Sequence, residues 1–98
     1  MTDRIHRAHI ATRAVRAGVD SDSQHGAVMP PLYLSSNFSF ERLGTPRTYD
    51  YSRSGNPTRD QLGSALAELE GGTGAVVTNT GMSAVVLVTH LLEADDLV

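Results

Sequence analysis

Two chemically important residue types are missing from this 98-residue sequence. Cysteine does not occur, which excludes disulfides, thiolate metal sites and cysteine nucleophiles. Lysine is also absent, since all eight cationic side chains are arginines. The chain therefore has no side-chain amine that can form a Schiff base, and any reaction that needs a lysine must take it from outside these residues.

The sequence also lacks a cationic excess and a long apolar run. Its formal charge of −3 at pH 7 argues against a general electrostatic attraction to nucleic acid or to an anionic membrane. The longest apolar run, residues 84–88, falls far short of the roughly 20 residues that span a bilayer, and residues 1–4 lead into no secretion signal. We expect no nucleic-acid or membrane partner, a cytoplasmic location, and only local anion sites.

Three segments are predicted to be helical: residues 8–17, 57–70 and 82–92. The second has the clearest start, because Asn56 is a favoured N-cap residue and Pro57 suits the first helical position. Its apolar residues recur at helical spacing and predict one buried stripe, formed by Leu62, Ala65, Leu66 and Leu69.

The remaining sequence favours an arm followed by the start of a parallel sheet. Residues 19–31 and 42–56 are polar, and the apolar alternation between them permits short extended segments. Residues 74–78 are typical of a buried strand, and residues 97–98 resemble the beginning of a second one. A strand, helix and strand in this order form a crossover unit. One such unit cannot cover its own sheet, so we expect a fragment of a larger α/β protein.

Two places in the sequence are candidate anion sites. Gly81 and Met82 follow the predicted strand and open a helix, where free amides and the helix dipole favour a phosphate. Tyr51 and Arg53 are two apart, so in an extended segment a hydroxyl and a guanidinium would point to the same side. Taken alone, both patterns favour a structural role over an anion site: a glycine that only makes a turn, and a solvated loop arginine.

Four ordered blocks of sequence resemble a known family: residues 26–36, 50–59, 67–72 and 78–84. They are similar to the N-terminal part of the cystathionine γ-synthase family, pyridoxal-phosphate (PLP) enzymes of cysteine and methionine metabolism. The resemblance covers nearly the whole chain from Thr12 onward. It implies an α/β fold, the N-terminal part of a fold-type I, aspartate aminotransferase-like transferase.

The resemblance also implies a division of the chain and roles for four residues. Residues 1–60 would be a helix and extended arm that contributes to a neighbouring subunit, and residues 61–98 the start of the PLP-binding large domain. The backbone amides of Gly81 and Met82 would hold the cofactor phosphate. Tyr51 and Arg53 would reach across the subunit interface to the phosphate of the neighbouring site. No catalytic residue and no metal ligand is expected within the chain.

The activity implied is replacement of the acyl group of an O-acylhomoserine, O-succinylhomoserine in the leading version, by L-cysteine to give cystathionine. The partners implied are amino-acid substrates and other copies of the chain, assembled as a homotetramer of two dimers. Ser54 leaves undecided whether the acyl group is succinyl or acetyl, because some γ-synthases carry arginine at this position. A γ-lyase, a homoserine sulfhydrylase and a noncatalytic phosphate-binding module remain alternatives. Glu68 is expected to be a solvated charge.

Overall fold

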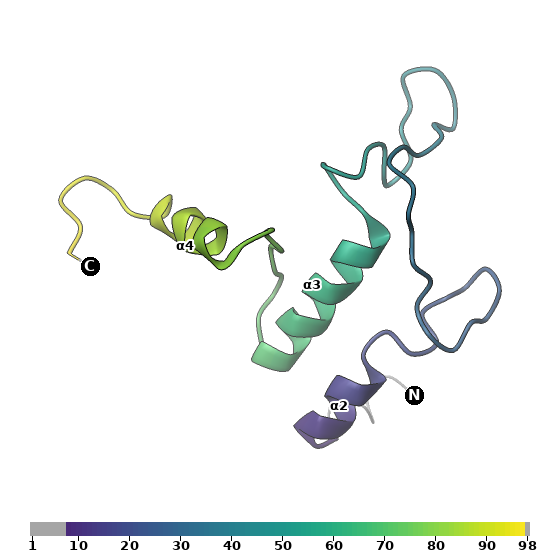
Figure 1. The fold of residues 1–98 in the computed structure, drawn as a ribbon, viewed down its shortest axis with the longest axis horizontal. Coiled ribbons are helices and arrows are strands. Elements are labelled where there is room, and N and C mark those ends of the chain that lie inside the picture. The colour runs from purple at the N-terminus through teal and green to yellow at the C-terminus, as the bar shows by residue number, and fades with distance from the viewer. Residues whose placement is uncertain (1–7, 98) are drawn as a thin grey trace.

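The computed structural model describes residues 8–97, and Figure 1 shows helices joined by long irregular segments. Within this range the helices are α2 (Ile10–Arg16), α3 (Pro57–Glu70) and α4 (Gly81–Thr89). All three predicted helices are confirmed, although α2 and α4 are shorter than expected. The backbone after Thr89 tightens, because the amides of residues 90–92 donate to carbonyls three positions back.

The start of α3 forms as the sequence predicts. Asn56 has an extended backbone, and its side-chain oxygen accepts hydrogen bonds from the amides of Thr58 and Arg59. Gly71 ends the helix in the left-handed region at φ 71°, a conformation that glycine adopts without steric cost. The helix therefore has a fixed first and last residue.

Helix α2 packs beside α3 and runs in the opposite direction. Arg13 pairs with Glu68 at 3.4 Å between Nε and Oε1 and also donates to the Glu68 carbonyl. At the other end, Gly18 has φ +76°, and a Cβ there would lie 2.6 Å from the Gln61 amide nitrogen. The expectation that Glu68 is only solvated is wrong, because its carboxylate anchors α2.

Between α2 and α3 the chain makes a long excursion and returns to the start of α3 (Figure 1). Its first half is fastened at Tyr33, whose amide donates to Thr58 Oγ1 at 2.9 Å and whose carbonyl accepts from Asn56 at 3.2 Å. Further along, Asn37 and Tyr51 form an isolated antiparallel bridge. The alternating pattern of residues 32–40 thus produces one bridge rather than a strand.

The predicted strand at residues 74–78 is not formed in the described part of the chain, where this segment is an irregular connection from α3 to α4 (Figure 1). A strand needs a neighbour to complete its ladder of hydrogen bonds, and residues 8–97 supply none. Leu97 likewise has no regular structure, and Val98 lies outside the described residues.

The predicted buried stripe of α3 is also wrong for this chain by itself. Leu62 is 50% exposed and Leu66 46%, while the buried hydrophobic residue of the described part is Ala67. The accessible surface is 8300 Å², whereas a compact protein of this mass exposes about 5400 Å². The apolar faces of α3 and α4 are therefore surfaces without a covering layer.

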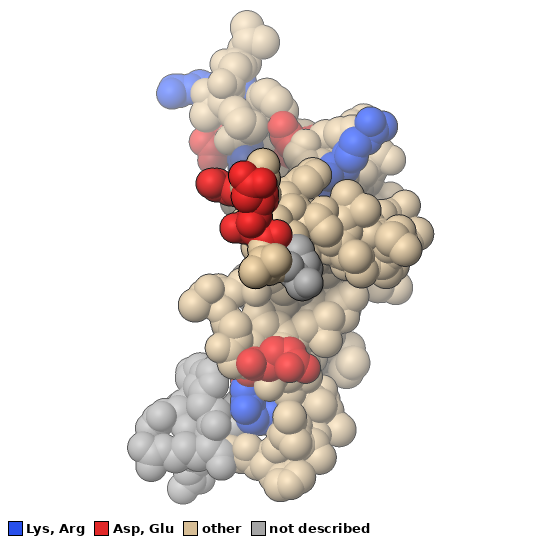
Figure 2. All heavy atoms as spheres, turned by 90° about the vertical axis from the view of Figure 1, so that its left-hand side faces the viewer, with Lys and Arg blue, Asp and Glu red and all other residues tan. Residues whose placement is uncertain are grey.

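Charged side chains are spread thinly over the face seen in Figure 2, apart from an acidic group near the C-terminal end. Three acidic residues follow α4, and all are exposed: Glu93, Asp95 and Asp96. No helix within residues 8–97 has the length and apolar character needed to cross a bilayer.

Candidate functional site

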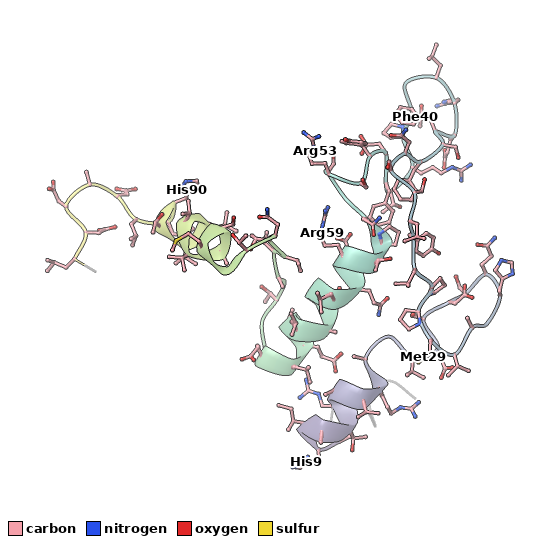
Figure 3. The ribbon with its side chains drawn as sticks, viewed as in Figure 1. His9, Met29, Phe40, Arg53, Arg59 and His90 are labelled. Atoms are coloured by element: carbon pink, nitrogen blue, oxygen red, sulfur yellow. The ribbon has the colours of Figure 1, made fainter. Side chains whose placement is uncertain are left out.

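The structure brings Tyr51 and Arg53 together. Arg53 Nη2 donates a hydrogen bond to the Tyr51 hydroxyl at 3.3 Å, and the guanidinium carbon lies 5.5 Å from the ring centroid. Both side chains are exposed, and Arg53 projects from the loop that precedes α3 (Figure 3). Two donors suited to a phosphate are thus presented side by side at the surface.

A tight turn after Tyr51 sets the direction of this pair. The amides of Ser54 and Gly55 both donate to the Tyr51 carbonyl, at 3.0 and 3.1 Å. On the other side, the Ser52 amide donates to Ser36 at 2.8 Å, which ties the segment to the bridge with residues 36–38. The backbone between the two functional side chains is therefore held at both ends.

Tyr49 packs behind this turn. Its ring lies 5.6 Å from that of Phe38, and a Cβ on Gly55 would approach it to 3.0 Å, so the close contact depends on glycine. Its hydroxyl donates to Asp60 Oδ2 at 2.9 Å. Burial, and then the hydrogen bond and negative charge of Asp60, raise the pKa of Tyr49 above its ordinary value.

Arg59, in the first turn of α3, reaches back to the same loop (Figure 3). Its Nη1 donates to the Ser52 carbonyl at 2.9 Å, and its Nη2 to the Arg53 carbonyl at 3.3 Å. Unlike Arg53, Arg59 is half-buried. Its two guanidinium nitrogens join the helix start to the backbone of the loop.

The second predicted pair, Gly81 and Met82, forms the first turn of α4. Thr80 is the N-cap, and its hydroxyl accepts from the Ser83 amide at 3.1 Å. The amides of Gly81 and Met82 have no hydrogen-bond partner within residues 8–97. A Cβ built on Gly81 would meet nothing within 4 Å, and the Met82 side chain is 70% exposed. Two amides at the positive end of the helix are open to an anion.

No hydrogen bond links the Tyr51–Arg53 pair to Gly81 or Met82 within the described residues. Each pair nevertheless offers hydrogen-bond donors, and a phosphate offers acceptor oxygens. The four residues therefore fit the phosphate end of PLP, two through the backbone and two through side chains. The described residues contain no group of three or more histidine, aspartate or glutamate side chains placed to hold a metal.

Sequence reasoning missed two supporting residues. Thr80 was recognisable, because threonine is a favoured N-cap residue and stands directly before the start of α4. Arg59 carried no comparable signal, since a side chain that returns to the preceding loop has no characteristic spacing. Only the fold shows that its guanidinium meets the carbonyls of residues 52 and 53.

Comparison with known proteins identifies the family of the chain. The chain superposes on cystathionine γ-synthase from Xanthomonas oryzae pv. oryzae in complex with cystathionine, with a TM-score of 0.79 and 64% identity, covering 85% of this chain and 21% of that one. The model of the family described as Cys/Met metabolism PLP-dependent enzyme matches residues 11–98. The fold of the described residues is thus shared with PLP-dependent enzymes. The chain belongs to the Cys/Met metabolism PLP-dependent enzyme family, and PLP, the predicted cofactor, is confirmed.

Two curated relatives represent two different enzymes of the family, a γ-synthase and a γ-lyase. Cystathionine γ-synthase of Escherichia coli (strain K12) is 62% identical over 79 residues, which are 81% of this chain and 20% of that protein. Cystathionine γ-lyase of Homo sapiens is 41% identical over 92 residues, which are 93% of this chain and 23% of that protein. The chain spans about a fifth of the length of these relatives.

Proposed function

We propose that the full-length protein is a cystathionine γ-synthase, which replaces the acyl group of an O-acylhomoserine by L-cysteine. The observation that carries this proposal is the gap in identity between 62% to a γ-synthase and 41% to a γ-lyase. The family membership argues against the noncatalytic module. Bound PLP supplies an electron sink, which permits deprotonation beside the amino group and departure of a γ-substituent.

In this proposal the described residues bind and orient the cofactor phosphate. The open amides of Gly81 and Met82 donate to it from the large domain, aided by the α4 dipole. Tyr51 and Arg53 donate from the arm of a neighbouring chain, so that two subunits complete one site. No hydrogen bond joins the two pairs within residues 8–97, so each pair has donors left for an external group.

The same proposal assigns the parts of the chain and the assembly. Residues 1–60 form the arm that serves the neighbour, and residues 61–98 begin the cofactor domain with its parallel sheet. The uncovered apolar faces of α3 and α4 are then the surfaces on which the rest of that domain packs. The enzyme is a cytoplasmic homotetramer of two catalytic dimers acting on amino acids.

The test is a product assay on the purified full-length protein. O-succinylhomoserine and O-acetylhomoserine are each supplied with L-cysteine, and cystathionine is quantified. In parallel, cystathionine alone tests lyase activity, and sulfide in place of cysteine tests sulfhydrylase activity. The proposal is supported if the kcat/KM for cystathionine synthesis is higher than the values for cystathionine cleavage and for the reaction with sulfide. Faster cleavage of cystathionine, or faster reaction with sulfide, overturns it in favour of the lyase or the sulfhydrylase.

A further inference from the structure

We propose that Arg59 is a positioning residue for the cofactor site, which acts by fixing the backbone that carries Tyr51 and Arg53. The inference rests on the phosphate role proposed for Arg53. It adds a residue of α3 that does not itself meet the phosphate. Its effect on cofactor binding is transmitted through the loop.

The hydrogen bonds of Arg59 fall on the stretch between the two functional side chains. Nη1 donates a hydrogen bond to the carbonyl of Ser52, the residue between Tyr51 and Arg53. Nη2 donates to the carbonyl of Arg53 itself. These two peptide groups lie on either side of the Arg53 Cα. Their orientation determines where the Arg53 side chain leaves the backbone.

The other hydrogen bonds of the loop do not reach the carbonyls of Ser52 and Arg53. The bridge to residues 36–38 holds the amide of Ser52, and the turn bonds hold the carbonyl of Tyr51. Within the described residues, Arg59 alone makes hydrogen bonds to the carbonyls of Ser52 and Arg53. Without Arg59, the peptide group between Ser52 and Arg53 would lose its hydrogen bond, and the one between Arg53 and Ser54 would be held by the turn alone.

Arg59 is suited to this task and poorly placed for direct phosphate contact. It is half-buried, its backbone belongs to the first turn of α3, and both terminal nitrogens are already engaged. A planar fork can reach two carbonyls at once, whereas an ammonium group is a single point donor. Because the backbone of Arg59 is helical and both terminal nitrogens are hydrogen-bonded, its side chain holds the exposed loop against the start of α3.

The experiment measures PLP dissociation constants of full-length apoenzyme by titration, for wild type, Arg53→Ala, Arg59→Ala and the double variant. We expect Arg53→Ala to weaken binding by roughly tenfold to a hundredfold. Arg59→Ala should weaken it by about fivefold to thirtyfold, because Arg53 remains but is no longer held. If Arg59→Ala binds PLP as wild type does, the positioning role is wrong.

The double variant separates positioning from direct contact. If Arg59 acts only through the loop, its loss should matter little once Arg53 is gone. The double variant should then bind within about twofold of Arg53→Ala. Fold-losses that multiply would overturn the inference, since they would mean that Arg59 contributes independently of Arg53.

Two further variants test whether the fork of Arg59 is needed and whether the loss of any positive charge in this region has the same effect. Arg59→Lys keeps the charge but not the fork, so it should restore only part of the affinity, and full restoration would contradict the fork. Arg42→Ala removes a charge from the same excursion, where Arg42 donates only to Thr45 at 3.2 Å, and should leave PLP affinity unchanged. If Arg42→Ala weakened binding as much as Arg59→Ala, a general charge effect would replace the positioning role.

Failure of this inference can be told apart from failure of the proposed function. PLP affinity of the apoenzyme does not depend on which reaction the loaded enzyme catalyses. If the product assay identifies a lyase but Arg53 and Arg59 remain coupled, the positioning role stands. Unchanged affinity in Arg53→Ala would overturn the phosphate role and, with it, the positioning role.

Discussion

The guanidinium of Arg53 lies over the Tyr51 ring, 5.5 Å from its centroid, and donates a hydrogen bond to the hydroxyl of the same ring at 3.3 Å. The two side chains therefore form one unit rather than two independent donors. The tyrosine hydroxyl keeps its own hydrogen to donate, and the guanidinium keeps several. In the proposed site, a phosphate that contacts one of them would also contact the other.

Arg53→Ala in the full-length protein is expected to weaken PLP binding by about 1.5 to 3 kcal/mol, the usual contribution of a charge-assisted hydrogen bond. Tyr51→Phe should cost less, because it removes a neutral hydroxyl. Equilibrium titration of the apoenzyme measures both. An Arg53→Ala enzyme with wild-type affinity would show that the pair does not meet the cofactor.

The shared-site proposal predicts complementation between two inactive variants. Arg53→Ala is mixed with a full-length variant that lacks its Schiff-base lysine, at limiting PLP. Random mixing gives about half hybrid dimers, each with one intact site, so about a quarter of wild-type activity should return.

The opposite result is equally clear for the hybrids. If Arg53 served its own chain, every site in a hybrid would lack either the arginine or the lysine. Activity would then stay at the level of the parents, even when mass measurement confirms that hybrids have formed.

Tyr49 predicts an alkaline dependence of stability. Because its pKa is raised on folding, the unfolded chain loses this proton first as the pH rises above about 10, and stability falls from there through the folded pKa. The stabilisation is fully present below that pH. Denaturant midpoints of the full-length protein between about pH 8 and pH 11 should fall more steeply for wild type than for Tyr49→Phe. Parallel curves for the two proteins would contradict the shift.

The 98-residue chain expressed alone is expected to lack both activity and a cooperative unfolding transition. It contains no lysine for the Schiff base, and its accessible surface of 8300 Å² leaves the apolar side of α4 without a partner. A cystathionine assay and a thermal scan by circular dichroism test the two statements. A sharp transition would show that the helices pack more tightly in solution than in the structure.

A substitution at Ser54 tests whether this position lies near the acyl group of the substrate. It follows Arg53 directly, and its side chain carries no charge that could pair with a free carboxylate. Ser54→Arg should lower the KM for O-succinylhomoserine, whose acyl group ends in a carboxylate, and leave that for O-acetylhomoserine nearly unchanged. An equal change for both substrates would place residue 54 away from the acyl group.

The parts of the fold that the sequence predicted are those decided by neighbours in the chain. Asn56 and Pro57 set the start of α3, and Gly71 sets its end, because capping involves residues only a few positions apart. The closeness of Tyr51 and Arg53 was predictable for the same reason. Their spacing of two in sequence already limits where the two side chains can point.

The predictions that failed, and the residue that was missed, depend on contacts that no local sequence pattern specifies. Residues 74–78 have strand-like composition, but their ladder needs a neighbour that the described residues do not contain. Leu62 and Leu66 have the right period for burial and no surface to be buried against. Arg59 meets carbonyls six and seven positions earlier, across a turn whose path no local pattern specifies.

The contact between Arg13 and Glu68 closes a loop of chain between α2 and α3. The entropy cost of closing a flexible loop rises only with the logarithm of its length, by about 0.6 kcal/mol for each doubling. Residues inserted at the exposed tip, where Arg42 and Thr45 form a tight bridge, should therefore change stability little. Breaking the Arg13–Glu68 closure instead frees α2 from α3, whereas the hydrogen bonds of Tyr33 to the start of α3 still confine the later part of the excursion, which carries Tyr51 and Arg53, to a much shorter loop.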